Sequence, residues 1–197
     1  QTPDSAGTLT ALVTGAKTDA GVSGVSEQVE RGKCESVAGN ELVSALELAE
    51  MAGMSTGIVT TARVTHATPA STYAKSADRN WEDISDMPKD AIAFGCQDIA
   101  QQLIDFETNL EMRFSGIDVD GIDVIMGGGR RHFLPKDPAA NSADAKSKIE
   151  GDRTDQQNLI AQWQAKYTDG VYVMDQAGFD ALNTQSTQQV LGLFNES

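Results

Sequence analysis

The sequence predicts an α/β fold with a central, largely parallel sheet flanked by helices. Short runs of β-branched and aliphatic residues alternate along the chain with longer segments whose apolar residues recur at helical spacing. The strand-like runs are apolar throughout, which is typical of strands buried on both faces of a parallel sheet. With 40% hydrophobic residues in 197, the chain is long enough to form a substantial core.

Three helices are predicted in the first half of the chain. The first begins at Ser5, a residue type that caps helices, and apolar residues follow it at helical spacing. Asn40–Gly53 has a capping residue, an apolar stripe and a terminal glycine. A third helix is expected from about Asp90 to Phe106. Between the first two, residues 21–33 are polar and rich in glycine, which predicts a loop.

Strands are predicted at four places. Thr56–Val64 is rich in β-branched residues and is expected to be buried. Ile122–Met126 runs into Gly127-Gly128-Gly129, which we interpret as a tight structural turn. Two further strands are expected at Val171–Met174 and Val190–Phe194.

The chain divides into three parts. Residues 1–135 would form part of the α/β core, and residues 136–155 are polar and contain turn-forming residues, so they predict a surface insertion or loop. Residues 156–197 would continue the α/β domain with a helix up to Lys166 and the last two strands. Because the chain starts without Met and stops just after an apolar strand, we expect it to be part of a longer protein.

Acidic residues outnumber basic ones 29 to 15, and the formal net charge is −14. This charge argues against nucleic acid or an anionic membrane as a partner. It is typical of secreted or salt-adapted proteins, and also of proteins that are merely very soluble. No apolar run approaches the roughly 20 residues of a membrane span, so no membrane-spanning segment is expected.

Several possible site motifs are incomplete. Gly15-Ala16-Lys17-Thr18 lacks the glycines of a phosphate-binding loop, and Gly127-Gly128-Gly129 does not open a helix as a dinucleotide site requires. His66 and His132 are the two histidines, and neither lies beside a nucleophile elbow. Taken alone, each histidine is best interpreted as partly exposed or satisfied by hydrogen bonds.

The two cysteines are Cys34 and Cys96. From composition alone they could be buried thiols or a disulfide, and two cysteines cannot form a four-ligand zinc site without other ligands.

Six short motifs follow one another in a fixed order, and they are Asp4-Ser5-Ala6-Gly7-Thr8, Gly39-Asn40-Glu41, Thr65-His66-Ala67-Thr68-Pro69, Ala77-Asp78-Arg79-Asn80-Trp81, Gly95-Cys96-Gln97-Asp98-Ile99-Ala100 and Asp123-Val124-Ile125-Met126-Gly127-Gly128-Gly129-Arg130. Together they resemble the alkaline phosphatase family, in the branch that includes animal and marine bacterial enzymes. The resemblance extends over essentially the whole chain, and it implies an incomplete alkaline phosphatase-like fold.

The resemblance implies hydrolysis of small phosphate monoesters through a phosphoserine intermediate. Ser5 would be the nucleophile, activated by zinc and by the helix N-terminus. Arg79 would bind two phosphate oxygens with its planar guanidinium, and Asp4 would hold that guanidinium in place.

The family's site contains two zinc ions and one magnesium ion. By position, Thr68 would ligate magnesium through its hydroxyl, and His66 would lie in the shell of the same ion. The resemblance also pairs Cys34 with Cys96 in a disulfide, which implies an oxidising compartment and a periplasmic or secreted protein. A homodimer is a further family expectation.

The sequence also departs from the family. The segments that carry most of the zinc ligands are absent, so we expect this chain alone to be inactive. Phe194-Asn195 stands where animal relatives have the Phe-Glu pair of a calcium site, which weakens the case for calcium there. Two alternatives stay open, namely a phosphodiesterase or sulfatase of the same superfamily, and an inactive fragment.

Overall fold

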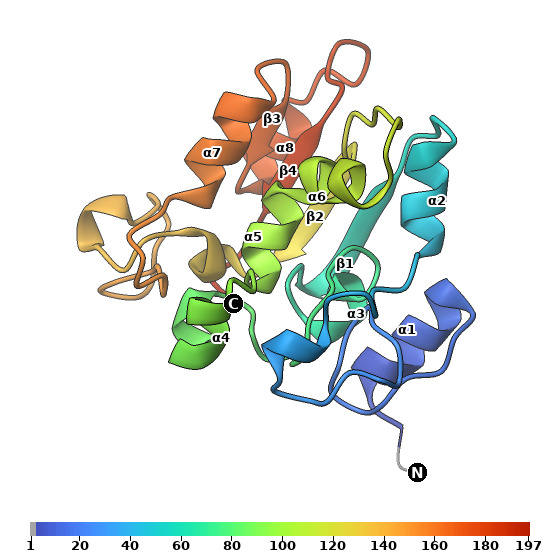
Figure 1. Cartoon of the computed structure of the whole chain (residues 1–197). Helices are drawn as coiled ribbons and strands as arrows, with labels where there is room; N and C mark the ends of the chain where they lie inside the picture. The colour runs from blue at the N-terminus through green and yellow to red at the C-terminus, as the bar shows by residue number, and fades with distance from the viewer. Residues whose placement is uncertain (1–2) are drawn as a thin grey trace.

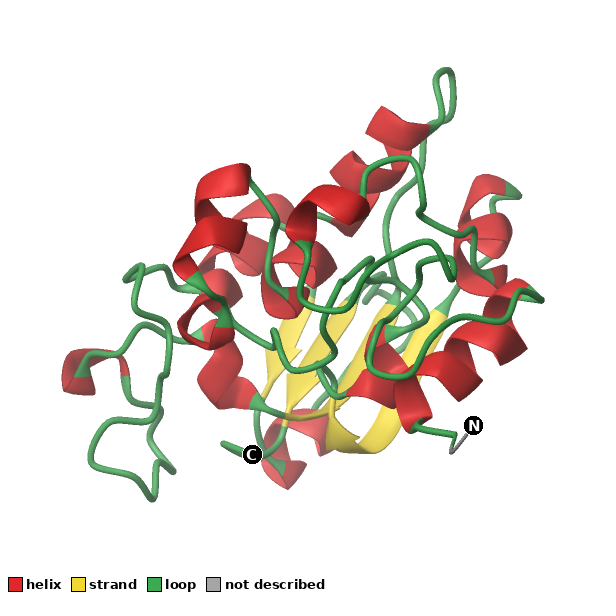
Figure 2. Cartoon of the chain, turned by 60° about the horizontal axis from the view of Figure 1, so that its bottom comes forward, coloured by secondary structure: helices red, strands yellow, loops and turns green. Residues whose placement is uncertain are grey.

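Four parallel strands form one sheet at the centre of the protein (Figures 1 and 2). The computed structural model describes residues 3–197. The strands lie in the order β1-β2-β4-β3, and they are β1 (Gly57–Arg63), β2 (Val124–Gly128), β3 (Val171–Val173) and β4 (Val190–Leu193). Every neighbouring pair is parallel. The predicted α/β fold class is therefore confirmed.

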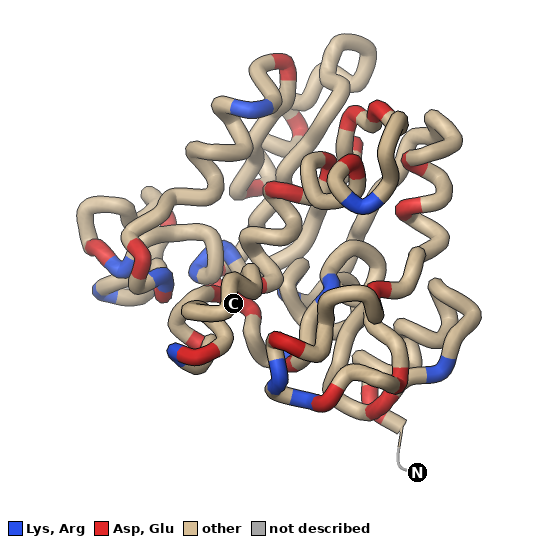
Figure 3. Tube along the Cα trace, in the orientation of Figure 1, with Lys and Arg blue, Asp and Glu red and all other residues tan. Residues whose placement is uncertain are grey.

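Short helices surround the sheet. They are α1 (Ser5–Thr14), α2 (Ala45–Met51), α3 (Ala67–Ala70), α4 (Lys89–Phe94), α5 (Ile99–Ile104), α6 (Phe106–Arg113), α7 (Leu159–Lys166) and α8 (Gln176–Asp180), with 3₁₀ helices η1 (Cys34–Ser36), η2 (Ile84–Asp86), η3 (Arg130–Phe133) and η4 (Pro138–Ala140). In the described part of the chain, none of them has the length and apolarity to cross a bilayer. Acidic residues are scattered over these helices and their loops (Figure 3).

The main core lies between the sheet and the helices α5, α6 and α7. Ile58, Ile125 and Leu191 come from three different strands and belong to the same buried cluster as Leu103 of α5 and Trp163 of α7. Removing these side chains from water is the largest favourable contribution to folding. The core therefore fixes the strands, and with them the segments that leave the strand ends.

The first strand is less buried than its composition predicted. β1 occupies an edge of the sheet and has β2 as its neighbour. Ile58 points into the core and is 6% exposed, whereas Val59 on the other face is 75% exposed. The strand predicted over Thr56–Val64 is confirmed, but the prediction that it is buried on both faces is wrong. An apolar run in the sequence does not reveal whether a strand is central or at an edge of the sheet.

The helix predicted over Asn40–Gly53 is shorter in the structure. Ser44 caps α2 by accepting a hydrogen bond from the Glu47 amide, and the Glu47 carboxylate accepts one from the Ser44 amide. Glu41 instead pairs with Val25 in an isolated antiparallel bridge. The predicted cap at Asn40 is therefore wrong, since the backbone that follows Asn40 is extended.

The helix predicted over Asp90–Phe106 is two helices. Gly95 ends α4 with a φ of +103°, a conformation that glycine adopts without strain, and Asp98 caps α5. Gly127 and Gly128 also differ from expectation, because they belong to β2 and the turn is made by Gly129, whose φ is +90°. In both places the chain changes direction at a single glycine.

Residues 136–155 include η4 and connect η3 to the segment before α7. Most of this segment is exposed, but Arg153 is 1% exposed and donates two hydrogen bonds to the buried Asp98 carboxylate, at 3.1 and 3.0 Å. Glu150 is also buried and pairs with Arg130 at 2.5 Å. The end of the segment is therefore held against the core. The three-part division of the chain stays a prediction, and Gln1 and Thr2 lie outside the described residues.

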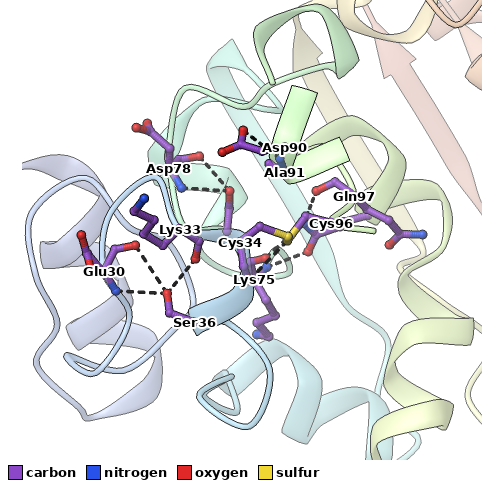
Figure 4. Close-up of a disulfide and its surroundings, with 12 residues drawn as sticks. Glu30, Lys33, Cys34, Ser36, Lys75, Asp78, Asp90, Ala91, Cys96 and Gln97 are labelled. Atoms are coloured by element: carbon purple, nitrogen blue, oxygen red, sulfur yellow. Dashed lines mark hydrogen bonds between the residues drawn. A yellow bond between two sulfur atoms is a disulfide. The ribbon is translucent and has the colours of Figure 1, made fainter. Parts of the chain in front are cut away.

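A disulfide joins Cys34 in η1 to Cys96 in the loop after α4, with 6.0 Å between the Cα atoms (Figure 4). Neither cysteine is free, so the pairing implied by the family resemblance is confirmed. The bond lies beside a second, smaller apolar cluster that contains Val29, Trp81 and Met87.

Removing this disulfide should destabilise the chain. The bond closes a separation of 62 residues, and the chain-entropy model gives a loss of about 4 kcal/mol for a loop of that size. Urea unfolding of a Cys34→Ala/Cys96→Ala double variant, compared with the oxidised wild type, measures the loss. A difference below about 1 kcal/mol would show that the disulfide contributes little to folding.

A buried carboxylate lies far from the disulfide, at the end of α2. Glu50 is 3% exposed, and its Oε1 accepts a hydrogen bond from the Thr56 hydroxyl. Its Oε2 is buried and has no hydrogen-bond partner among the described residues. Burial raises the pKa of Glu50, and the negative charges of Asp120 and Asp123 raise it further.

Glu50→Gln should therefore stabilise the chain at alkaline pH. Because the folded-state pKa of Glu50 lies above its ordinary value of 4.5, the folded state binds more protons than the unfolded state, and stability falls as pH rises from about 4.5 through the raised pKa. Glutamine keeps the acceptor for Thr56 without this penalty. Unfolding curves at pH 4 and pH 8 should show a gain for Glu50→Gln at pH 8 alone, with exposed Glu27→Gln as the control. An equal loss at both pH values would contradict the argument.

Candidate functional site

The candidate site lies where the N-terminus of α1 approaches the segment that follows β1. α1 packs on α3, and α3 in turn packs on β1, as Figure 1 shows. Residues from three distant parts of the sequence meet here, namely Asp4 and Ser5, His66, and Arg79. All four were singled out from the sequence.

Ser5 is the first residue of α1, and Asp4 is its N-cap. One carboxylate oxygen of Asp4 accepts from the Gly7 amide at 2.9 Å, and the other accepts from the Gly21 amide at 3.0 Å. Asp4 therefore does two things at once, since it caps the helix and ties the helix to the loop that contains Gly21. The sequence placed Ser5 at a helix N-terminus correctly, but the cap is the preceding residue.

Arg79 reaches this helix N-terminus from the loop after α3. Its Nη1 donates to Ser5 Oγ at 2.9 Å and lies 3.3 Å from Asp4 Oδ2. The Arg79 backbone amide donates to the Gly21 carbonyl at 2.8 Å. The Arg79 side chain is 19% exposed, so it is held in place by these contacts and remains partly open to solvent.

The charge state of Asp4 suits this arrangement. Burial acts to raise the pKa of Asp4, but hydrogen bonds from the Gly7 amide, Arg79 and the Gly21 amide outweigh it, and the pKa is lowered. Asp4 is therefore ionised at neutral pH and compensates part of the Arg79 charge.

His66 lies on the other side of the same guanidinium. Its Nε2 is 3.3 Å from Arg79 Nη2. Burial lowers the pKa of His66, and the positive charges of Arg63 and Arg79 lower it further, so the ring is neutral at neutral pH and can accept a hydrogen bond from Arg79. Thr68 is exposed on α3, with no hydrogen bond to the other site residues.

A carboxylate that the sequence analysis did not single out supports the segment before His66. Both oxygens of Glu82 accept from Arg63, at 2.8 and 2.7 Å, and Glu82 also accepts from the Thr65 hydroxyl at 2.6 Å. These three residues flank or lie within the recognised motifs, but their mutual contacts depend on the fold. The network fixes the chain at the point where β1 ends and α3 begins.

The donors present do not complete the metal set that the family resemblance implies. Ser5, His66 and Thr68 offer two hydroxyls and one imidazole, which are too few for two zinc ions and one magnesium ion. Among the described residues, the group of carboxylates and histidine close enough to share an ion is Asp83, His132 and Asp152, and it contains none of the three.

The arrangement does suit a tetrahedral oxyanion. A serine hydroxyl at the first position of a helix, beside a partly exposed guanidinium, can meet an anion with the positive end of the helix dipole and with paired N–H donors. A hydroxyl and a cation 2.9 Å apart can contact the same phosphate group.

The chain is similar to known alkaline phosphatases. The family model described as alkaline phosphatase matches residues 1–197. The human tissue-nonspecific isozyme of alkaline phosphatase is 40% identical over 197 residues, which covers 98% of this chain and 35% of that protein. The crystal structure of a cold-active alkaline phosphatase from a psychrophilic Shewanella superposes with a TM-score of 0.59 and 27% identity, covering 98% of this chain and 32% of the other.

A variant of the alkaline phosphatase from the Antarctic bacterium TAB5, solved with magnesium in its M3 site, has a TM-score of 0.61 at 20% identity and covers 98% of this chain and 39% of its own. This last likeness shows the fold alone. The chain thus spans about a third of the length of the relatives it matches. The family is metal-dependent. Since the family model and the human relative both match essentially the entire sequence, this chain belongs to the alkaline phosphatase family.

Proposed function

We propose that this chain supplies the nucleophile Ser5 and the phosphate-binding Arg79 for the hydrolysis of small phosphate monoesters, through a phosphoserine intermediate, by the intact protein. The single observation that carries this proposal is the 2.9 Å contact between Ser5 Oγ and Arg79 Nη1 at the N-terminus of α1. It brings a serine hydroxyl and a guanidinium side by side in a chain that belongs to the alkaline phosphatase family, which supports these roles for Ser5 and Arg79.

On binding, the phosphate would accept hydrogen bonds from Arg79 nitrogens that now contact Asp4, Ser5 and His66. Arg79 holds Asp4 and Ser5 through one nitrogen and faces His66 with the other. Two phosphate oxygens would accept from these nitrogens in the fork geometry of a guanidinium. Asp4 would keep the guanidinium aimed at the phosphate, because it is fixed by the Gly7 and Gly21 amides.

The reaction would then proceed in two displacements. The Ser5 oxygen attacks phosphorus, its bond to phosphorus forms as the bond to the substrate alcohol breaks, and the alcohol leaves with a proton. Water next attacks the phosphoserine, inorganic phosphate departs, and Ser5 regains its proton. In both steps Arg79 would stabilise the negative charge on the oxygens that are not transferred.

The intact protein would hold two zinc ions and one magnesium ion. Ser5 would bind zinc, Thr68 would bind magnesium through its hydroxyl, and His66 would lie in the shell of the magnesium ion. Because this chain lacks the remaining ligands, it is proposed to be inactive by itself.

The surroundings of the protein follow from other features. A disulfide persists in oxidising compartments, which supports a periplasmic or secreted location. The net charge of −14 argues against nucleic acid as a partner, and an anionic phosphate monoester would have to be held by a local cation such as Arg79. Homodimerisation and adaptation to salt remain proposals of the same kind.

Ser5→Ala should abolish the phosphoenzyme in the intact protein, because alanine has no oxygen to accept phosphorus. Rapid-quench assays with a labelled phosphate monoester, stopped in acid, measure the trapped protein-bound phosphate. The exposed Thr8→Ala, on the same turn of α1, serves as the control and should keep it. A normal burst in Ser5→Ala would refute the assignment of the nucleophile.

Arg79→Lys should weaken phosphate binding while leaving the fold intact. Lysine keeps one charge but loses the paired donors, and the loss of a charged hydrogen bond costs about 1.5–3 kcal/mol. The inhibition constant for inorganic phosphate should therefore rise roughly 10- to 100-fold in the intact protein.

The same variant distinguishes a phosphomonoesterase from the alternative of a phosphodiesterase or sulfatase. In a phosphomonoesterase, turnover of monoesters should fall far more than turnover of diesters or sulfate esters. An equal fall for all three substrate classes would favour the alternative.

A further inference from the structure

A group of side chains of the kinds that ligate metal ions lies outside the candidate site. Asp83, His132 and Asp152 each place a ligand atom within 4.8 Å of those of the other two. They come from the start of η2, from η3 and from the segment before α7, so the fold brings together three separate parts of the chain. None of the three belongs to the site around Ser5.

His132 is oriented by carboxylates on both ring nitrogens. The residue is 7% exposed, its Nδ1 lies 2.6 Å from Asp83 Oδ2, and its Nε2 lies 3.4 Å from Glu82 Oε2. Glu82 is in turn fixed by Arg63 and Thr65. A metal-binding histidine commonly donates its second ring N–H to a carboxylate, which sets the ring orientation and raises the basicity of the ligating nitrogen. Here Glu82 would provide that carboxylate, and an ion between His132 and Asp83 would replace their 2.6 Å hydrogen bond through Nδ1.

The two aspartates are also held in position. The other oxygen of Asp83 accepts from the Ser85 amide at 2.7 Å. Asp152 follows Gly151, where an added Cβ would lie 2.2 Å from the Pro135 carbonyl oxygen, and precedes the buried Arg153. The Asp152 side chain itself is 40% exposed. Two ligands are thus buried, and the third opens a path to solvent.

Charged groups of both signs surround the cluster. Glu82 pairs with Arg63 at 2.7 Å, Asp152 lies 4.0 Å from Arg131, and Arg153 donates to the His132 carbonyl at 3.3 Å. Asp83 pairs with His132 itself, and η2 contributes a further carboxylate, Asp86. Arg131 compensates little of the Asp152 charge, because its Nε is 4.0 Å from Asp152 and donates to the Glu196 carbonyl at 3.0 Å.

We propose that Asp83, His132 and Asp152 form a binding site for one zinc-like divalent transition-metal ion, separate from the site around Ser5. Zinc binds imidazole nitrogen and carboxylate oxygen at about 2.0–2.2 Å, so small side-chain rotations bring all three ligands onto one ion. Water would complete the shell on the exposed side of Asp152. The imidazole favours zinc, cobalt or nickel over magnesium and calcium, which prefer oxygen ligands.

An ion on Asp83, His132 and Asp152 would add a further link between segments that already share hydrogen bonds, such as the Asp152 amide to the Arg131 carbonyl at 3.0 Å. An ion that binds the folded state and not the unfolded state raises stability with its concentration. Metal binding should therefore raise the midpoint of thermal unfolding, in addition to producing a spectroscopic signal.

The test uses the full 197-residue chain, freed of metal with a chelator and titrated with Co²⁺ and Zn²⁺. We expect one equivalent of Co²⁺ with visible d–d absorption, displacement by Zn²⁺, and a rise in the unfolding midpoint. His132→Gln and Asp152→Asn should each weaken binding at least tenfold. Asp152 is partly exposed, so Asp152→Asn should fold even where His132→Gln does not.

Two control variants separate this site from the one around Ser5. Ser5→Ala and His66→Gln should leave the Co²⁺ signal and its affinity unchanged. Loss of the signal in either control, an unchanged affinity in folded Asp152→Asn, or no stoichiometric binding to the wild type would overturn the proposal. Because the readouts are absorption and unfolding midpoint, the result does not depend on phosphatase activity.

Discussion

The candidate site depends on one carboxylate that is shared between local and distant partners. Asp4 caps α1, binds the Gly21 amide and holds Arg79. Each contact alone contributes modestly, since hydrogen bonds and partly exposed ion pairs are worth about 1 kcal/mol or less. Their value lies in geometry, because they fix the helix N-terminus, the glycine loop and the guanidinium relative to one another.

The sheet supplies the other half of the site. β1 ends at Arg63, and the chain then turns immediately through Thr65 and His66 into α3. A buried core on one face of the strands sets the direction of this turn, and the Arg63–Glu82 pair keeps it from moving. The position of His66 beside Arg79 therefore rests on a strand whose other face is exposed to solvent at Val59.

Much of this fold could be predicted from the sequence, because strand type and order of elements follow from local apolar patterns. Boundaries could not, since Glu41 pairs with the distant Val25 instead of joining a helix, and the burial of β1 depends on its place in the sheet. Among site residues, Ser5 and Arg79 were found through motifs. Glu82 was missed because its role exists only through contacts with residues 17 and 19 positions away.

Glu82 also connects the two sites. One of its oxygens accepts from Thr65 and lies near His132, while Arg63 binds both. A cation on His132 would make the Nε2 proton more acidic and draw it closer to Glu82. That shift would weaken the hydrogen bond from the Thr65 hydroxyl to the same oxygen of Glu82. Thr65 immediately precedes His66. Glu82 is thus a carboxylate that contacts both His132 and the segment that leads into His66, while the ligands of the two sites remain different residues.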